Sequence, residues 1–239
     1  MSEAAVAEAL AAVRERIQRA AEQSGRNPAE VRLLAVSKRQ PALKIRAAYA
    51  AGQRDFGENY SQELLAKQAE LGDLPDLRFH MIGALQRNKL PGLLGVISAL
   101  HSVDSLRLIE DLGRRAPARP VPLARRLLPG GELAVFLEVN LGAEDHKAGC
   151  DPAELGQLMD AVLAQPSLSL RGLMAIPAGA GEPQSARRQF EALLELRERH
   201  GGALRLPELS IGMSRDLEVA VACGSSWVRV GTDVFGART

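Results

Sequence analysis

Short runs of consecutive apolar residues alternate along the chain with longer stretches in which apolar residues recur every three or four positions. Apolar runs are typical of strands that are buried on both faces of a parallel sheet, whereas the second pattern is typical of amphipathic helices. We therefore expect eight strands, over residues 33–38, 55–59, 78–83, 99–104, 133–140, 170–176, 208–213 and 226–231.

Helical patterns fill the spaces between these runs. An alanine-rich helix up to about residue 21 precedes the first strand. Residues 116–131 contain four prolines, which favour an irregular connection with one helical turn. The other helices are expected over residues 41–50, 61–71, 86–96 with a break near 91–92, 151–163, 184–200 and 214–223, and from residue 105 onward.

Strands that alternate with helices through 239 residues predict a single (β/α)8 barrel, a TIM barrel, with an extra N-terminal helix. No linker of the kind that separates domains interrupts the cycle, so residues 1–239 are expected to form one domain. The alternative is an open, doubly wound sheet. It is disfavoured because no Gly-x-Gly-x-x-Gly turn follows the first strand.

The first apolar run stops abruptly at Lys38, which the barrel would place at the C-terminal mouth, where such folds keep their chemistry. A partly desolvated lysine amine can attack a carbonyl group, whereas a guanidinium cannot. Lys38 is therefore a candidate nucleophile, and a solvated lysine at a strand end is the alternative. Nearly all of the other positive charge is arginine, and the remaining lysines are Lys44, Lys67, Lys89 and Lys147.

The loops after the seventh and eighth strands are the common phosphate site of such barrels. Here they contain Gly212-Met213-Ser214 and Gly231-Thr232. Glycine allows close backbone approach, and hydroxyl and N–H groups suit a phosphate dianion, although glycine also ends strands for steric reasons. A lysine nucleophile opposite such loops suggests an aldehyde phosphate held as a Schiff base, namely pyridoxal 5′-phosphate (PLP).

Arg229 alternates with Val228 and Val230 in the last strand, so its side chain is expected to point into the barrel. Beside a pyridine nitrogen, a permanent cation would disfavour protonation of the ring and weaken the cofactor as an electron sink. The alternative is a structural ion pair with an acidic residue such as Glu138 or Glu58. The sequence leaves both readings open.

A set of short motifs follows in one order along nearly the whole chain: Ala35-Val36-Ser37-Lys38, Phe56-Gly57-Glu58-Asn59-Tyr60, His80-Met81-Ile82-Gly83, His101-Ser102-Val103-Asp104-Ser105, Arg171-Gly172-Leu173-Met174, Leu209-Ser210-Ile211-Gly212-Met213-Ser214 and Val228-Arg229-Val230-Gly231-Thr232. In this order the motifs resemble the pyridoxal phosphate homeostasis proteins, a PLP-binding family with an alanine racemase N-terminal-domain-like barrel of fold type III. So many motifs in one order make the resemblance highly specific.

The resemblance implies a role for individual residues. By it, Lys38 is the Schiff-base lysine and Arg229 faces the pyridine nitrogen of PLP. The residues that it assigns to the phosphate are Ser214, Gly231 and Thr232, and those that it assigns to the walls of the site are Asn59 and Met213.

Around the rim of the site the chain departs from the pattern of that family. Met81 and Ala84 stand where phenylalanine and proline are common, and Arg87 stands where a serine is usual. These departures leave the assigned cofactor residues intact. Lys89 and Lys147 are expected as solvated charges, with a secondary role in docking or passing on PLP as the alternative.

Three functions are weighed. The first is a non-catalytic homeostasis protein that stores PLP, buffers its free level and delivers it to apo-enzymes. The second is a PLP-dependent amino-acid racemase. Racemases of this fold type carry an added C-terminal β-domain, whereas the sequence here ends at Thr239. Racemisation by two bases also needs a second base opposite Lys38, and the sequence offers no persuasive candidate. The third, a sugar-phosphate aldolase, does not explain the motif set. We expect the first, with weak racemase-like activity left open.

Composition narrows the partners. A net charge of +1 and an aromatic content of 3% give no reason to expect nucleic acid or an anionic membrane as partner. The N-terminal stretch lacks the features of a signal peptide, and no apolar run approaches the length of a membrane span. Cys150 and Cys223 lack metal-like spacing and are expected as small core or loop residues. We expect a cytoplasmic monomer whose partners are PLP and PLP-dependent apo-enzymes.

Other residues with acid–base chemistry are expected to be structural. His80 and His101 lie within apolar strand patterns, where a hydrogen-bonded core histidine is the commoner case. Glu58 and Asp104 are expected to cap the following helix or to pair with arginine. Tyr60 is expected to be a partly buried residue at the start of a helix, with contact to the cofactor as the alternative.

Overall fold

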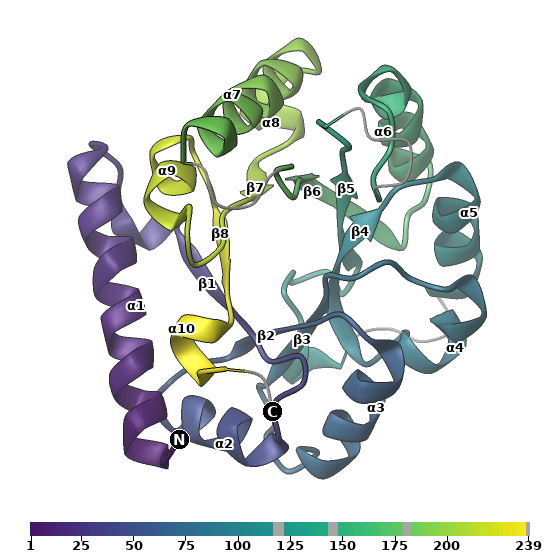
Figure 1. Ribbon diagram of the computed structural model, residues 1–239. Helices are drawn as coiled ribbons and strands as arrows, with labels where there is room; N and C mark the ends of the chain where they lie inside the picture. Colours follow the sequence, from purple (N-terminus) through teal and green to yellow (C-terminus); the bar gives the residue numbers. More distant parts are fainter. Residues whose placement is uncertain (117–121, 143–147, 179–182, 238–239) are drawn as a thin grey trace.

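In the computed structural model, eight parallel strands close into a barrel in which consecutive strands are neighbours and β8 pairs with β1 (Figure 1). The structure describes residues 1–116, 122–142, 148–178 and 183–237. The predicted (β/α)8 barrel is confirmed. The strands are β1 (Arg32–Val36), β2 (Asp55–Glu58), β3 (Arg78–Met81), β4 (Ile97–Val103), β5 (Leu133–Glu138), β6 (Leu168–Met174), β7 (Glu208–Ser210) and β8 (Trp227–Val230).

The helices surround the barrel, and the predicted N-terminal helix is present (Figure 1). The α-helices are α1 (Glu3–Gln23), α2 (Ala42–Ala50), α3 (Ser61–Glu70), α4 (Leu90–Leu93), α5 (Leu106–Arg115), α6 (Leu155–Leu163), α7 (Pro183–Arg199), α8 (Gly202–Arg205), α9 (Leu217–Ala222) and α10 (Thr232–Phe235). Short 3₁₀ turns are η1 (Pro28–Glu30), η2 (Arg87–Lys89), η4 (Leu123–Arg125) and η5 (Pro152–Glu154).

The helix predicted over residues 86–96 is wrong in extent, because the chain forms only η2 followed by the four-residue α4. Pro91 fits the first turn of α4, where a missing N–H costs nothing. Gly95 then takes a φ of +81°, which ends the helical path. The next strand accordingly begins at Ile97, two residues before the predicted start.

The loop after β7 is also longer than predicted. The strand ends at Ser210 and α9 begins at Leu217, whereas the expected strand extended to residue 213 and the helix began at 214. Gly212 breaks the strand with a φ of +92°, and the carboxylate of Asp216 accepts a hydrogen bond from the Met213 N–H at 2.5 Å. Within residues 116–131 the predicted helical turn is η4, and residues 117–121 lie outside the described part of the chain.

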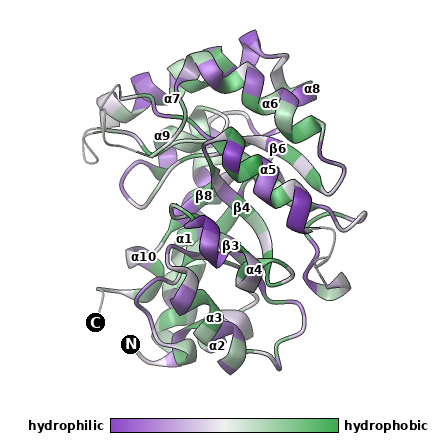
Figure 2. Ribbon diagram, turned by 90° about the vertical axis from the view of Figure 1, so that its right-hand side faces the viewer, coloured by the Kyte–Doolittle hydropathy of each residue, from purple (hydrophilic) through white to green (hydrophobic). Residues whose placement is uncertain are grey.

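Two apolar cores pack against the strands. The larger lies between the barrel and its helices, and the smaller fills the barrel itself. Figure 2 shows this division as hydrophobic segments in the interior strands and hydrophilic positions on outer helices such as α5 and α7. The residues of the inner core are Leu34, Ile82, Ala99, Ala134, Phe136, Met174 and Trp227.

Helix α1 lies against α2, α9 and α10 on the outside of the barrel (Figure 1). It buries an apolar stripe with helical spacing, formed by Val6, Leu10, Val13 and Ile17. Its other face is charged. Neither α1 nor another helix of the described ranges combines the length and apolar character that crossing a membrane requires.

Candidate functional site

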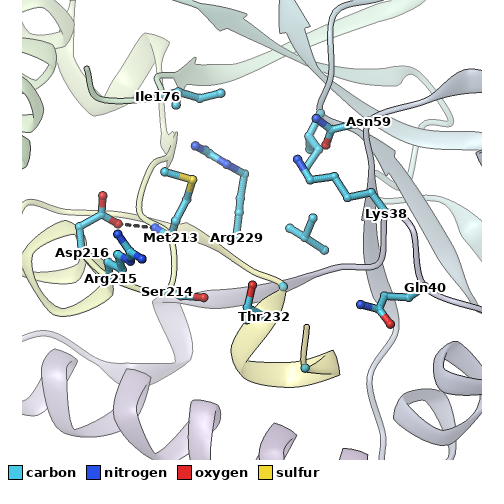
Figure 3. Close-up of a pocket in the computed structure, with 14 residues that line it drawn as sticks. Lys38, Gln40, Asn59, Ile176, Met213, Ser214, Arg215, Asp216, Arg229 and Thr232 are labelled. Carbon is cyan, nitrogen blue, oxygen red and sulfur yellow. Dashed lines mark hydrogen bonds between the residues drawn. The ribbon is translucent and has the colours of Figure 1, made fainter. Parts of the chain in front are cut away.

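All seven residues predicted to bind the cofactor line one cavity of about 270 Å³ at the C-terminal mouth of the barrel. They are Lys38, Asn59, Met213, Ser214, Arg229, Gly231 and Thr232. Figure 3 shows the side chains of Lys38 and Arg229 extending into this cavity, with the hydroxyl groups of Ser214 and Thr232 toward its other end. The structure thus brings the predicted residues together around one cavity.

Lys38 is presented by a tight turn just beyond β1. The prediction placed Lys38 at the last position of the strand. The strand ends at Val36, so Lys38 lies two residues beyond it. The N–H of Ser37 still continues the sheet by donating to the carbonyl oxygen of Gly57 at 3.0 Å. Arg39 then takes a φ of +58°, a left-handed conformation that a non-glycine residue adopts only where surrounding contacts impose it.

Those contacts come from a buried group of side chains that we call the Lys67 cluster, formed by Ser37, Glu58, Glu63 and Lys67. The Lys67 ammonium donates to the carbonyl oxygen of Ser37 at 2.6 Å and to the carboxylates of Glu58 at 2.6 Å and Glu63 at 2.7 Å. Glu58 also accepts the Ser37 hydroxyl at 2.6 Å. Glu63 accepts the Arg39 N–H at 2.5 Å. The cluster therefore holds the residues on both sides of Lys38.

The Lys67 cluster was not found by sequence reasoning, which placed Lys67 only among the remaining lysines. Burial raises the pKa of Glu58, and the neighbouring charge of Lys67 opposes that rise. The expected arginine partner or helix cap for Glu58 is wrong, because its partner is Lys67. Since Glu58 is fully buried, a charged partner is what permits a carboxylate there.

Arg229 points into the barrel, as its alternation with valines predicts. One guanidinium nitrogen, Nη1, donates to both oxygens of Ser210, with the hydroxyl at 3.0 Å, and Nη2 donates to the carbonyl oxygen of Ala175 at 3.0 Å. The alternative ion pair with Glu58 or Glu138 does not form among the described residues. Burial lowers the pKa of Arg229 to about 10, so the guanidinium stays charged at neutral pH.

Glu138 ends β5 and is almost completely buried. Burial raises the pKa of Glu138 to about 7, against the opposing field of the Arg229 charge. Glu138 thus feels Arg229 without a direct ion pair. With a pKa of about 7, this carboxyl group is part protonated at neutral pH.

The two loops at the other end of the cavity are held close to the barrel and to each other. A Cβ atom on Gly231 would lie 3.0 Å from the carbonyl oxygen of Val36, and one on Gly212 would lie 2.4 Å from the Cβ of Ala220. From outside, Arg16 of α1 donates to the Ser214 carbonyl oxygen at 2.9 Å. The same guanidinium pairs with Glu218 after β7, at 2.9 Å, and with Asp233 after β8, at 2.7 Å.

The cavity suits a ligand with a carbonyl group at one end and a phosphate at the other. Lys38 supplies an amine, Arg229 a donor-only cation, and Ser214 and Thr232 supply hydroxyl groups. The Oδ1 atom of Asn59 is buried without a hydrogen-bond partner among the described residues, which is costly unless a ligand satisfies it. These features fit PLP, the cofactor suggested by the sequence.

The other candidates lie outside this cavity. His80 and His101 are buried, hydrogen-bonded core residues, as predicted. Tyr60 is 47% exposed instead of partly buried and does not line the cavity. Lys89 is also absent from the lining, and Lys147 lies outside the described residues. Lining residues that sequence reasoning did not assign to the site include Gln40, Ile82, Ile176, Arg215 and Asp216.

Comparison with known proteins gives the family that the sequence motifs resemble. Residues 9–239 match the family described as alanine racemase, N-terminal domain. A curated relative, the pyridoxal phosphate homeostasis protein of Pseudomonas aeruginosa, is 47% identical over 237 residues, which covers 98% of this chain and 96% of the relative. The chain therefore belongs to the alanine racemase N-terminal domain family and, within it, to the pyridoxal phosphate homeostasis proteins.

Solved structures agree with the fold. PipY of Synechococcus elongatus, in a structure with PLP bound, is 40% identical, has a TM-score of 0.80, and matches 97% of this chain and 100% of that chain. An alanine racemase from Streptomyces coelicolor has a TM-score of 0.73 at 23% identity. The match covers 98% of this chain and 58% of the racemase. At this level of identity the likeness shows only that the two proteins share the barrel fold.

Proposed function

We propose that this protein binds PLP through a Schiff base on Lys38 and acts in PLP homeostasis by storing the cofactor, buffering its free level and delivering it to apo-enzymes. The observation that carries the proposal is the convergence of Lys38, Arg229 and the hydroxyl groups of Ser214 and Thr232 on one cavity. Membership of the PLP homeostasis family and the PLP-bound structure of a 40% identical relative support it.

Each residue has a defined task in this proposal. The Lys38 amine condenses with the aldehyde and releases water, while Ser214, Gly231 and Thr232 receive the phosphate. Asn59 offers its unpartnered Oδ1 to the ligand. Arg229 presents N–H groups to the ring nitrogen and, because a guanidinium cannot accept a proton, keeps that nitrogen unprotonated. Bound PLP supplies a carbonyl group for the lysine and an aromatic ring that can draw electrons from an attached amine.

The cavity favours a carrier over a catalyst. Racemisation by two bases needs a proton-transferring group on each face of the bound amino acid. Among the described lining residues, the ionisable side chains are those of Lys38, Arg215, Asp216 and Arg229. The two arginines are not general bases, and the carboxylate of Asp216 is engaged by the N–H of Met213. Lys38 therefore lacks an evident opposite base, and an amino-acid racemase is the second, less favoured function.

The broader assignments belong to the same proposal. Residues 1–239 act as one PLP-binding barrel domain, in the cytoplasm and as a monomer, with PLP-dependent apo-enzymes as recipients. Neither nucleic acid nor membrane takes part. The net charge of +1 supports leaving out nucleic acid and anionic membranes, and the gathering of the predicted cofactor residues around one cavity supports a single PLP-binding domain.

The test compares storage with catalysis in one preparation. Purified protein is loaded with PLP, freed of excess cofactor, and mixed with a PLP-dependent apo-enzyme whose activity reports transfer. The same sample is incubated with L-alanine in D₂O, and exchange of the α-hydrogen is followed by NMR. The proposal predicts activation of the apo-enzyme with exchange no faster than with free PLP. Fast exchange together with D-alanine would establish the racemase instead.

A Lys38→Ala variant is the matched control for both assays. Because the variant lacks the amine that holds the aldehyde, it is expected to retain almost no PLP and to activate no apo-enzyme. A variant that keeps and delivers PLP as well as the original protein would overturn the assignment of Lys38.

A further inference from the structure

A continuous chain of hydrogen bonds crosses the inside of the barrel from the cofactor cavity to the opposite end of β2. Starting at Arg229, the chain reaches the Ser210 hydroxyl at 3.0 Å. The Ser210 hydroxyl lies 2.8 Å from His101 Nδ1, and His101 Nε2 lies 3.0 Å from His80 Nδ1. His80 Nε2 lies 3.1 Å from a carboxylate oxygen of Asp55. Five strands contribute one residue each, namely β8, β7, β4, β3 and β2.

The direction of this chain follows from its two ends. A guanidinium only donates, so Ser210 Oγ accepts from Arg229 and directs its own hydrogen to His101 Nδ1. His101 then carries its proton on Nε2 and donates to His80 Nδ1. His80 in turn carries its proton on Nε2 and donates to Asp55, which as a carboxylate only accepts. In this arrangement every contact is satisfied with both imidazoles as Nε2–H tautomers.

The reverse arrangement fails at Ser210. If His80 were doubly protonated, it would donate in both directions, and His101 would have to donate from Nδ1 to the Ser210 hydroxyl. Ser210 Oγ would then receive two donors, and its own hydrogen would have no acceptor among the described residues. Since Ser210 is fully buried, an unmatched hydroxyl hydrogen there is unfavourable.

The electrostatic surroundings favour a neutral imidazole at His101. Burial, with nearby positive charges including that of Arg229, lowers the pKa of His101 well below its usual range. Burial alone would raise the pKa of Asp55, but hydrogen bonds from Arg78 and His80 hold it well below its usual range. Each neutral group turns its acceptor atom toward Arg229 and its donor toward Asp55, so the aligned dipoles stabilise both charges.

We propose that Ser210, His101, His80 and Asp55 are positioning residues for the cofactor site, which fix the Arg229 guanidinium as an immobile, charged donor toward the ring nitrogen of bound PLP. This inference rests on the proposed binding of PLP. Arg229 has no direct carboxylate partner among the described residues and is bonded to neutral oxygens of Ser210 and Ala175. The carboxylate at the far end, Asp55, is fixed by Arg78, which donates to both of its oxygens at 2.6 and 2.8 Å. The acidic residues whose charge reaches Arg229 are Glu138 and Asp216.

Substitution of Ser210 tests the role with little loss of volume. Ser210→Ala removes the one hydroxyl that joins Arg229 to the imidazoles. The matched control is Ser98→Ala, which removes another buried hydroxyl, one that donates to the Arg125 carbonyl oxygen at 2.7 Å and is not part of the chain. A purely structural role for Ser210 predicts that the two variants behave alike.

The first readout needs no ligand. In cofactor-free protein labelled with ¹⁵N, NMR of the imidazole nitrogens is expected to show His80 and His101 as neutral Nε2–H tautomers, assigned through His80→Asn and His101→Asn. Exchange between the two terminal nitrogens of Arg229, which reports rotation of the guanidinium, should be slow in the original protein and in Ser98→Ala. We expect it to be at least about tenfold faster in Ser210→Ala, because a hydrogen bond to a charged group is lost.

The second readout uses PLP. Ser210→Ala is expected to bind PLP about tenfold more weakly and to shift the visible absorption of the bound cofactor, whereas Ser98→Ala should change neither. A doubly protonated His80, an Nδ1–H tautomer of His101, or equal guanidinium rotation in both serine variants would overturn the inference. If the original protein takes up no PLP, the proposed function fails, while the ligand-free measurements still decide whether the chain holds Arg229.

Discussion

The ammonium group of Lys67 lies 2.6 Å from a carboxylate oxygen of Glu58 and, at the same distance, donates to the carbonyl oxygen of Ser37, the residue before Lys38. Both members of this ion pair are buried. The proposed Schiff-base lysine therefore follows a residue whose backbone is fixed by an ion pair between α3 and β2.

Removing Lys67 should therefore be costly. Lys67→Met leaves the buried Glu58 carboxylate without its cation, and we expect the free energy of unfolding to fall by about 3 kcal/mol. Urea denaturation measures the loss. The double variant Lys67→Met with Glu58→Gln is the control, because it removes both charges and should recover a large part of the stability. If Lys67→Met alone were as stable as the original protein, the ion pair would not support the turn.

Arg16 links the N-terminal helix to the two loops assigned to the phosphate, through Ser214, Glu218 and Asp233. Arg16→Gln frees these loops from each other, and we expect PLP affinity to weaken by about fivefold with little change in stability. Arg19→Gln, one turn along α1, removes an exposed pair with Glu15 and serves as the control. Equal PLP affinity in the two variants would show that α1 does not hold the loops.

Glu138 predicts a pH dependence of stability. Its pKa is about 7 in the folded protein and 4.5 as the ordinary value, so between these pH values the folded state keeps a proton that the unfolded chain has lost. The contribution of Glu138 to the free energy of unfolding is therefore fully present below pH 4.5 and is lost as the pH rises from 4.5 through 7. The loss is about 3 kcal/mol, since a tenfold change in proton affinity corresponds to about 1.4 kcal/mol.

Urea denaturation across this pH range measures that dependence. Glu138→Gln mimics the protonated acid, so its free energy of unfolding should fall by about 3 kcal/mol less over the same window. Glu15→Gln, at an exposed position on α1, should keep the slope of the original protein. Parallel pH profiles for the original protein and Glu138→Gln would contradict the raised pKa.

Lys38 itself should contribute little to folding. Its side chain extends into the cavity and not into either apolar core (Figure 3). The free energy of unfolding of Lys38→Ala is therefore expected to lie within about 0.5 kcal/mol of that of the original protein, while the visible absorbance of bound PLP is lost. Global unfolding of this variant, measured by circular dichroism, would count against the placement of Lys38.

The sequence was enough to predict the barrel and seven of the residues that line the cavity. Apolar runs determine which segments are strands, and a parallel barrel brings the ends of its strands together whatever the details of packing. That is why Lys38, Asn59, Ser214 and Arg229, which lie far apart in the chain, could be placed around one site.

The supporting interactions could not be predicted in the same way. The series of hydrogen bonds from Arg229 to Asp55 depends on which face of the sheet each strand residue occupies. A shift of register by one residue would turn His80 or His101 out of the barrel. Lys67 resembles any helical lysine until the fold buries it against Glu58. Arg16 meets Ser214 across 198 positions of sequence, and no local pattern signals that contact.

The central claim is that Lys38 holds PLP, and one measurement tests it most directly. Protein incubated with PLP is reduced with borohydride, digested and analysed by mass spectrometry, so that a Schiff base becomes a stable amine on the lysine that carried it. The account predicts loss of the visible band and a pyridoxyl phosphate group on Lys38, with Lys44, Lys67 and Lys89 unmodified at stoichiometric PLP. A label spread over exposed lysines, or a protein that takes up no PLP, would contradict it.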